Sequence, residues 1–114
     1  MITVRTTNPN NIYQGIIRGI QNGSIDTWKI VTVGNLVYFT HDTTNKQWLN
    51  KSYMKAGTDS HGNLIFHVIR NNENSFDQNI FAVYQGRFIQ MLVSHFPNSF
   101  TELNVTSQPT IDEM

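Results

Sequence analysis

The stretch Thr27–His41 reads TWKIVTV, GN and LVYFTH, and it decides the fold more than any other part of the chain. Two runs rich in β-branched and aromatic residues flank Gly34-Asn35, a pair that favours the two-residue turn of a β-hairpin. The register set by this turn pairs Val33 with Leu36, Ile30 with Phe39, and Trp28 with His41. Both faces of the hairpin carry apolar side chains, so we expect it to be covered on both sides or to lie centrally in its sheet.

The segments on either side of this hairpin complete the predicted fold. Four further strands are predicted, over residues 2–6, 47–56, 64–70 and 100–105. One helix begins after Asn8-Pro9-Asn10 and stops at Asn22-Gly23, and a second spans about residues 76–96, with Ser75 and Asp77 as its cap. The order is therefore β-α-β-β-β-β-α-β. This order predicts an α+β fold, with an antiparallel sheet of about four to six strands and two helices packed on one face.

Composition sets the remaining limits. A length of 114 residues with 39% hydrophobic residues fits a single domain, 1–114, whose acidic tail, about 108–114, we expect to fray. The absence of cysteine excludes disulfides and thiolate sites. Eight basic and eight acidic residues give no net charge, which disfavours binding to nucleic acid or an anionic membrane. No apolar run reaches membrane-spanning length and the start lacks signal-peptide features, so we expect a cytoplasmic protein.

The second helix is apolar around an unusually large part of its surface. Its apolar positions cover about 200°, twice the roughly 100° that packing on one sheet requires. The polar remainder is a narrow strip made of Gly86, Arg87, Gln90 and Ser94. Either the first helix or a second copy of the chain covers the excess. In the second case the sequence predicts an isologous dimer interface through Phe81, Ile89, Val93 and Phe96.

The histidines are the candidates for chemistry, because the chain has no established catalytic or phosphate-binding motif. His41 ends the hairpin opposite Trp28, where a carboxylate from Asp26 or Asp42 can orient the ring and raise its pKa. His95 lies on the apolar face of the second helix. If this helix crosses the tryptophan face of the hairpin, the two imidazoles share a pocket. The candidate catalytic residues are then His41, His95 and Asp42, and the candidate ligand-binding residues are Trp28, Trp48, Tyr84 and Arg87.

Each of these residues also has a purely structural interpretation. His41 can be a strand-end residue stacked on Trp28, His95 can be a helix C-terminal histidine favoured by the helix dipole, and the tryptophans can be core fillers. We therefore expect a homodimeric binding or interaction module whose partner is itself and, in addition, another protein or a small molecule. The alternative is a small enzyme or small-ligand binder with the His41/His95 pocket. Enzymatic activity is left open, with the absence of motifs pointing away from it, and no metal or cofactor is expected.

Overall fold

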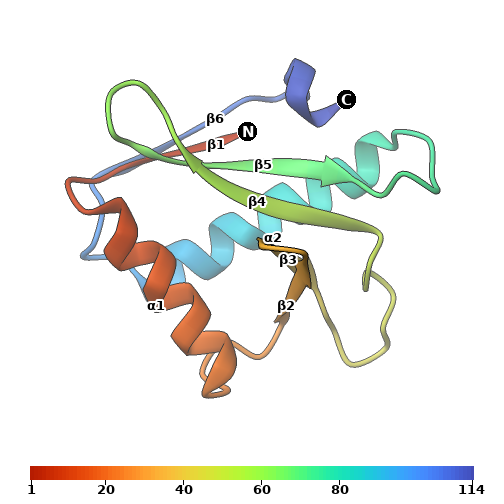
Figure 1. The fold of residues 1–114 in the computed structure, drawn as a ribbon, viewed down its shortest axis with the longest axis horizontal. Coiled ribbons are helices and arrows are strands. Elements are labelled where there is room, and N and C mark those ends of the chain that lie inside the picture. Colours follow the sequence, from red (N-terminus) through yellow and green to blue (C-terminus); the bar gives the residue numbers. More distant parts are fainter.

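In the computed structural model, residues 1–114 form one antiparallel six-stranded sheet with two helices packed on one face (Figure 1). The spatial order of the strands is β2-β3-β4-β5-β1-β6. Along the chain the elements are β1 (Ile2–Arg5), α1 (Pro9–Gln21), β2 (Trp28–Val33), β3 (Leu36–His41), β4 (Ser52–Thr58), β5 (Leu64–Arg70), α2 (Gln78–His95), β6 (Glu102–Val105) and the short 3₁₀ turn η1 (Ile111–Glu113). The predicted α+β class and element order are confirmed.

The β2–β3 hairpin has the predicted register but not the predicted surroundings. Val33 pairs with Leu36 and Trp28 with His41, as the two-residue turn requires. However, β2 is an edge strand, and both helices pack on the face that carries Trp28 and Phe39. The prediction that the hairpin is central or covered on both sides is therefore wrong. The connections through α1 and α2 run over the same face, so the other face stays bare.

The third predicted strand begins later than expected. It was placed at residues 47–56, whereas β4 starts at Ser52. Asn50 adopts a left-handed backbone conformation with φ 59°, and its N–H donates to Thr40 Oγ1 at 3.0 Å. The Lys51 N–H donates to the Trp48 carbonyl at 3.1 Å. These contacts turn the chain before β4, so Trp48 lies half-buried on a loop and not on a strand.

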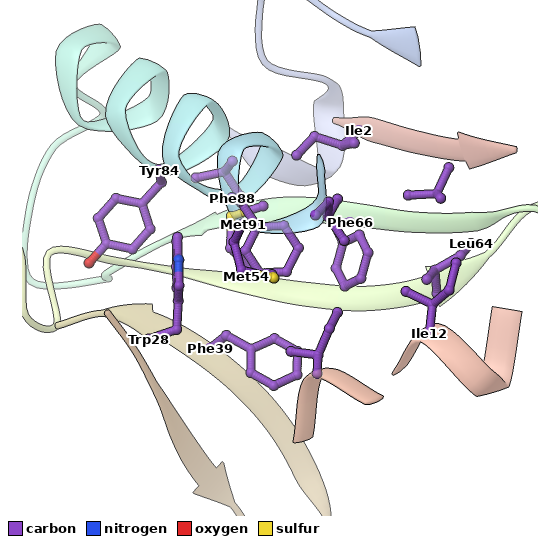
Figure 2. Close-up of a cluster of buried hydrophobic side chains, with 14 of the residues drawn as sticks. Ile2, Ile12, Trp28, Phe39, Met54, Leu64, Phe66, Tyr84, Phe88 and Met91 are labelled. Carbon is purple, nitrogen blue, oxygen red and sulfur yellow. The ribbon is translucent and has the colours of Figure 1, made fainter. Parts of the chain in front are cut away.

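The core lies between the sheet and the two helices, with Phe88 of α2 at its centre (Figure 2). The Phe88 ring centroid is 4.6 Å from Phe66, 5.0 Å from Trp28 and 6.1 Å from Phe39. Helix α1 adds Ile12 and Ile16, which are fully buried in the same cluster. One continuous core therefore joins strands from both halves of the sheet. Neither helix is long and apolar enough to span a membrane.

The wide apolar surface of α2 is largely covered within the chain. Phe81 is only 3% exposed and belongs to the core. Ile89 and Phe96 are half-buried against the core, and a Cβ on Gly15 of α1 would lie 2.7 Å from the Phe96 ring. Only Val93, at 50% exposure, is free. Of the dimer interface predicted through these four α2 residues, Phe81 is therefore covered within the chain, and Val93 is the most exposed.

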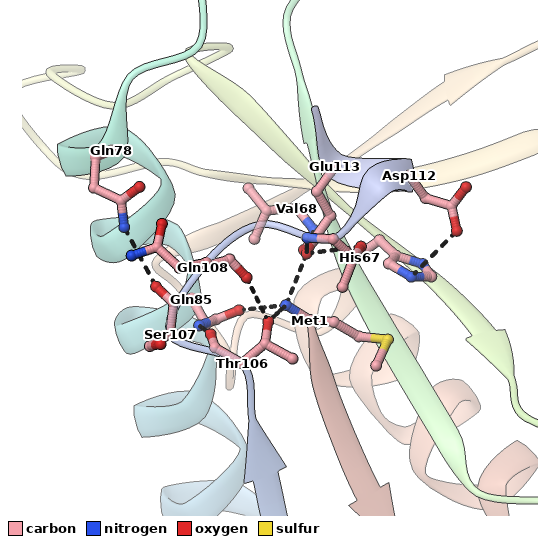
Figure 3. A network of polar contacts seen from close by, with 11 residues as sticks. Met1, His67, Val68, Gln78, Gln85, Thr106, Ser107, Gln108, Asp112 and Glu113 are labelled. Carbon is pink, nitrogen blue, oxygen red and sulfur yellow. Dashed lines mark hydrogen bonds and ion pairs between the residues drawn. The ribbon is translucent and has the colours of Figure 1, made fainter.

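The C-terminal residues, expected to fray, fold back over the sheet (Figure 3). The side chain of Glu113 is buried, and its carboxylate accepts hydrogen bonds from the Val68 N–H at 2.7 Å and the Thr110 N–H at 2.9 Å. The amino group of Met1 lies 2.9 Å from the same carboxylate and 2.8 Å from Gln85 Oε1. Partners from distant parts of the chain thus hold the tail, which local composition does not reveal.

Candidate functional site

A cleft of about 420 Å³ lies between the C-terminal half of α2 and the hairpin end where β2 begins and β3 finishes. Helix α2 forms one wall. The opposite wall consists of the segment before β2, the last residue of β3 and the loop that follows it. Of the predicted site residues, the structure brings His41, His95, Trp48 and Arg87 to this cleft. Most of the lining is polar.

His41 is held in one orientation. Its ring centroid is 4.8 Å from that of Trp28, and the side chain is only 4% exposed. Its Nδ1 lies 2.9 Å from the Thr27 carbonyl oxygen. Because a carbonyl oxygen can only accept, Nδ1 carries the proton and Nε2 keeps a free lone pair when the ring is neutral.

The other ring nitrogen of His41, Nε2, is unpartnered. It has no hydrogen-bond partner in the chain, since the only ring contact is the one through Nδ1. The one buried side-chain polar atom without a partner is Nε1 of Trp28. Because the ring lines the cleft, Nε2 is the ring nitrogen that is left for a ligand there. This arrangement provides an oriented hydrogen-bond acceptor in the cleft wall.

Burial keeps this imidazole neutral. It lowers the pKa of His41 below its ordinary value of 6.5, and the positive charge of Arg87 acts in the same direction. The hydrogen bond to Thr27 and the negative charge of Asp42 oppose this effect without reversing it. At pH 7 His41 is therefore an acceptor and not a cation.

The α2 wall presents cationic and neutral donors. Arg87, Gln90 and Ser94 are spaced three and four residues apart, which places them on one stripe of the helix. The Arg87 Nη1 donates to Gln90 Oε1 at 3.1 Å. His95, the last residue of α2, is exposed beside this stripe. The carboxylate of Asp26 lines the cleft on the hairpin side, so the cleft contains both a guanidinium and a carboxylate.

The remaining predicted site residues lie outside the cleft. The Asp42 carboxylate is 2.7 Å from Lys46 Nζ and does not line it. Trp28 and Tyr84 are buried behind His41. The Tyr84 hydroxyl bonds to the Trp48 carbonyl and to Thr40 Oγ1, so it fixes the loop that carries Trp48. These side chains position the wall of the cleft without facing its interior.

Sequence reasoning assigned no site role to Gln90, Ser94 or Thr27. The first two belong to the polar strip of the second helix, so their shared face was visible in the sequence. Of that strip, only Arg87 is predicted as a ligand-binding residue. The role of Thr27 lies in its backbone carbonyl, which no residue pattern marks. The spacing of side chains in the sequence therefore identifies part of the site. The part that backbone groups form is seen only in the structure.

Comparisons with protein-family models, curated protein sequences and solved structures find no match for this chain. Within the structure, no group of three or more His, Cys, Asp or Glu side chains is placed to hold a metal ion. The cleft geometry is therefore the basis for a functional proposal.

Proposed function

We propose that this chain is a small binding protein whose cleft between α2 and the β2–β3 hairpin takes up a small polar molecule. The observation that carries the proposal is the free Nε2 of His41, on a ring that is 4% exposed and fixed by Thr27. Burying an imidazole costs free energy unless its polar atoms find partners. Here one nitrogen has a backbone partner, and the other is left for a ligand.

The cleft chemistry defines the kind of ligand. Arg87 and His95 suit a carboxylate or phosphate oxyanion, because a guanidinium forms strong, directed hydrogen bonds to these groups. The His41 acceptor requires a hydroxyl or amino donor on the same molecule. The half-buried Trp48 offers a flat apolar surface for a ring. We therefore propose an oxyanion with a hydrogen-bond donor at its far end.

We propose binding and not catalysis at this site. An acid–base mechanism through His41 with Asp42 as its orienting carboxylate needs the two side chains to act together in the cleft. Asp42, the carboxylate predicted for that task, forms an ion pair with Lys46 outside the cleft. The Thr27 carbonyl holds His41 in its place, and a carbonyl fixes the tautomer but does not exchange protons.

A matched set of three probes tests this proposal by amide NMR titration. 4-Hydroxybenzoate carries the oxyanion, the ring and the donor, whereas phenol lacks the oxyanion and benzoate lacks the donor. We expect 4-hydroxybenzoate to bind most tightly, with the largest shifts in the cleft. Arg87→Gln is expected to weaken its binding by about tenfold or more, since a hydrogen bond to a charged group contributes about 1.5–3 kcal/mol.

Arg5→Gln is the matched control, because Arg5 pairs with Glu102 at the opposite edge of the sheet. This variant should bind 4-hydroxybenzoate as the original chain does. Phenol binding as tightly as 4-hydroxybenzoate, or an Arg87→Gln variant with unchanged affinity, contradicts the proposed ligand chemistry. Shifts that avoid the cleft altogether contradict the proposed site.

We propose, as a second function, that the chain acts as a homodimeric interaction module. The observation that favours it is the bare face of the sheet, where Val33 is 61% and Leu36 49% exposed and a hollow of about 350 Å³ lies beside them. Exposed apolar surface of this kind is typical of interaction sites. Sedimentation at increasing concentration tests it, and a chain that stays monomeric at high micromolar concentration contradicts it.

A further inference from the structure

The outer edge of β2 is an open strand edge of the sheet. It pairs only with β3, on its inner side, and no hydrogen bond from any other segment reaches its outer side. It is six residues long, has no proline, and Lys29 is its one charged residue. Such an edge is a template for pairing with another strand, and proteins normally shorten, charge or cover it.

The hydrogen bonds between β2 and β3 show which backbone groups of β2 point away from β3. The Asp42 N–H donates to the Thr27 carbonyl at 2.8 Å, so Thr27 faces β3. In an antiparallel ladder the residues that face the partner strand alternate. Lys29, Val31 and Val33 therefore also face β3. The N–H and C=O groups of Trp28, Ile30 and Thr32 point outward; Trp28 is only 3% exposed, so the open groups are those of Ile30 and Thr32.

These outward groups match a second copy of the same strand. If two β2 strands run antiparallel about a two-fold axis at Ile30, Ile30 pairs with Ile30 of the other copy and Trp28 with its Thr32. The outward N–H and C=O groups of both Ile30 residues then have partners. Pairing residues share a sheet face, so the helix-covered faces of both copies lie on one side and their cores become continuous.

The side chains of β2 also tolerate this pairing. Lys29 falls opposite Val31 of the second copy and not opposite its own equivalent, so like charges do not face each other directly. The bare face continues across the junction, with Val31, Tyr38, Tyr53 and Ile69 lining its hollow in each copy. The chain has no net charge, so little long-range repulsion opposes the approach.

The opposite edge of the sheet is less suited to a partner. Strand β6 has four residues, including Glu102 and Asn104, which are exposed and bonded to Arg5. A short edge strand with a charge is one of the ways in which proteins discourage pairing. The occupant that fits the free edge is thus a second copy joined through β2.

We propose that two copies of the chain pair through β2 in antiparallel orientation to form one continuous sheet across both copies. This inference rests on the homodimer proposed above and names its surface. It adds a surface that the predicted α2 interface lacks, namely a row of unpartnered backbone groups with a self-complementary arrangement.

Amide hydrogen exchange on the unmodified chain tests the proposal without any substitution. We expect the amides of Ile30 and Thr32 to exchange quickly in dilute solution and to become protected at high micromolar concentration. The amides of Val31 and Val33, which face β3, are the internal control and should be protected throughout. Outward amides that exchange quickly in a sample shown to be dimeric would overturn the proposal.

A matched pair of lysine substitutions separates this surface from α2. Val31→Lys places a lysine directly opposite Lys29 of the other copy, twice by symmetry, so we expect the dimer dissociation constant to rise about tenfold. Val93→Lys introduces the same change at a valine that is 50% exposed on α2 and should leave it unchanged. Circular dichroism verifies that both variants fold, and the exchange experiment stands independently of them.

The outcomes separate the inference from the function that it rests on. A chain that is monomeric at high micromolar concentration contradicts both. A dimer that Val93→Lys weakens and Val31→Lys does not supports the homodimer but overturns the β2 surface. A dimer weakened only by Val31→Lys, with protected outward amides, supports both.

Discussion

The β2 edge of the sheet differs from the side where the two chain termini meet. On the side of β1 and β5, called the tied edge here, Glu113 receives hydrogen bonds from Val68 and Thr110 and lies against the Met1 amino group (Figure 3). At the β2 edge the outward backbone groups of Ile30 and Thr32 have no partner, and the cleft with His41 opens beside the start of β2. The same core supports both edges, so the difference lies in what covers them.

This difference separates stability from interaction. The Glu113 carboxylate and the Met1 amino group are satisfied inside the chain, whereas the β2 edge retains a lone pair, open backbone groups and exposed apolar side chains. Groups of that kind gain free energy only from an external partner. We therefore expect substitutions at the tied edge to change the free energy of unfolding, and substitutions at the free edge to change binding.

The largest change in the free energy of unfolding is expected at Phe88, in the core that both edges of the sheet share. Phe88→Ala removes a ring in contact with Phe66, Trp28 and Phe39, so the free energy of unfolding should fall by about 3–5 kcal/mol. Chemical denaturation measures it, with Phe76→Ala, at a residue 39% exposed, as the control expected to cost less than about 1 kcal/mol. Equal losses of unfolding free energy in the two variants would contradict a core that is centred on Phe88.

A smaller loss should follow from breaking the tied edge. Glu113→Gln removes the charge that the Val68 and Thr110 N–H groups and the Met1 amino group stabilise, and we expect the free energy of unfolding to fall by about 2 kcal/mol. Asp112→Asn, at a neighbouring exposed carboxylate, should change it by less than about 0.5 kcal/mol. Denaturation curves of the two variants that coincide would contradict a tied C-terminus.

The pKa of Glu113 predicts where this contribution disappears. Burial alone raises that pKa, but the hydrogen bonds from Thr110 and Val68 and the Met1 amino group lower it below the ordinary value of 4.5. Its stabilisation is thus present above the unfolded-state pKa and is lost as the pH falls through the folded-state value. Below that value the original chain and Glu113→Gln should converge in stability.

Substitutions at two glycines are expected to change the free energy of unfolding by still smaller amounts. Gly34, in the hairpin turn at the free edge, has φ 61°, so Gly34→Ala should lower the free energy of unfolding by about 1 kcal/mol. Gly86 lies on the exposed strip of α2 with open space where a Cβ would point, so Gly86→Ala should raise it by about 0.5–1 kcal/mol. Thermal denaturation detects the opposite signs, and a destabilising Gly86→Ala would imply an occupied α2 surface.

The smallest effect is expected from His41 alone. Its pKa is lowered in the folded state, mainly by burial, so the unfolded chain binds the extra proton more readily. Stability therefore rises with pH from the folded-state pKa up to about the ordinary value of 6.5 and is flat above it. His41→Gln should remove this slope in denaturation curves between pH 5 and 7, whereas His61→Gln, at an exposed turn, should keep it.

The parts of the structure that local sequence determines were predicted well. The register of the hairpin follows from Gly34-Asn35, and the opposition of Trp28 and His41 follows from that register. The start of β4 was predicted wrongly, because the turn at Asn50 depends on Thr40 in another strand. The burial of Glu113 depends on Val68, which lies 45 residues away. The same holds for the cleft. His41 and Arg87 were identified from the sequence, but the Thr27 carbonyl that orients His41 was not.

The most direct test of the free edge as an interaction site is the ¹⁵N spectrum of the His41 imidazole during titration with 4-hydroxybenzoate. We predict a neutral ring at pH 7 with the proton on Nδ1, and an Nε2 resonance that moves to saturation as the probe binds. The exposed ring of His61 should not change. A His41 ring protonated on Nε2, or an Nε2 resonance that stays fixed throughout the titration, would contradict the proposed role of the cleft.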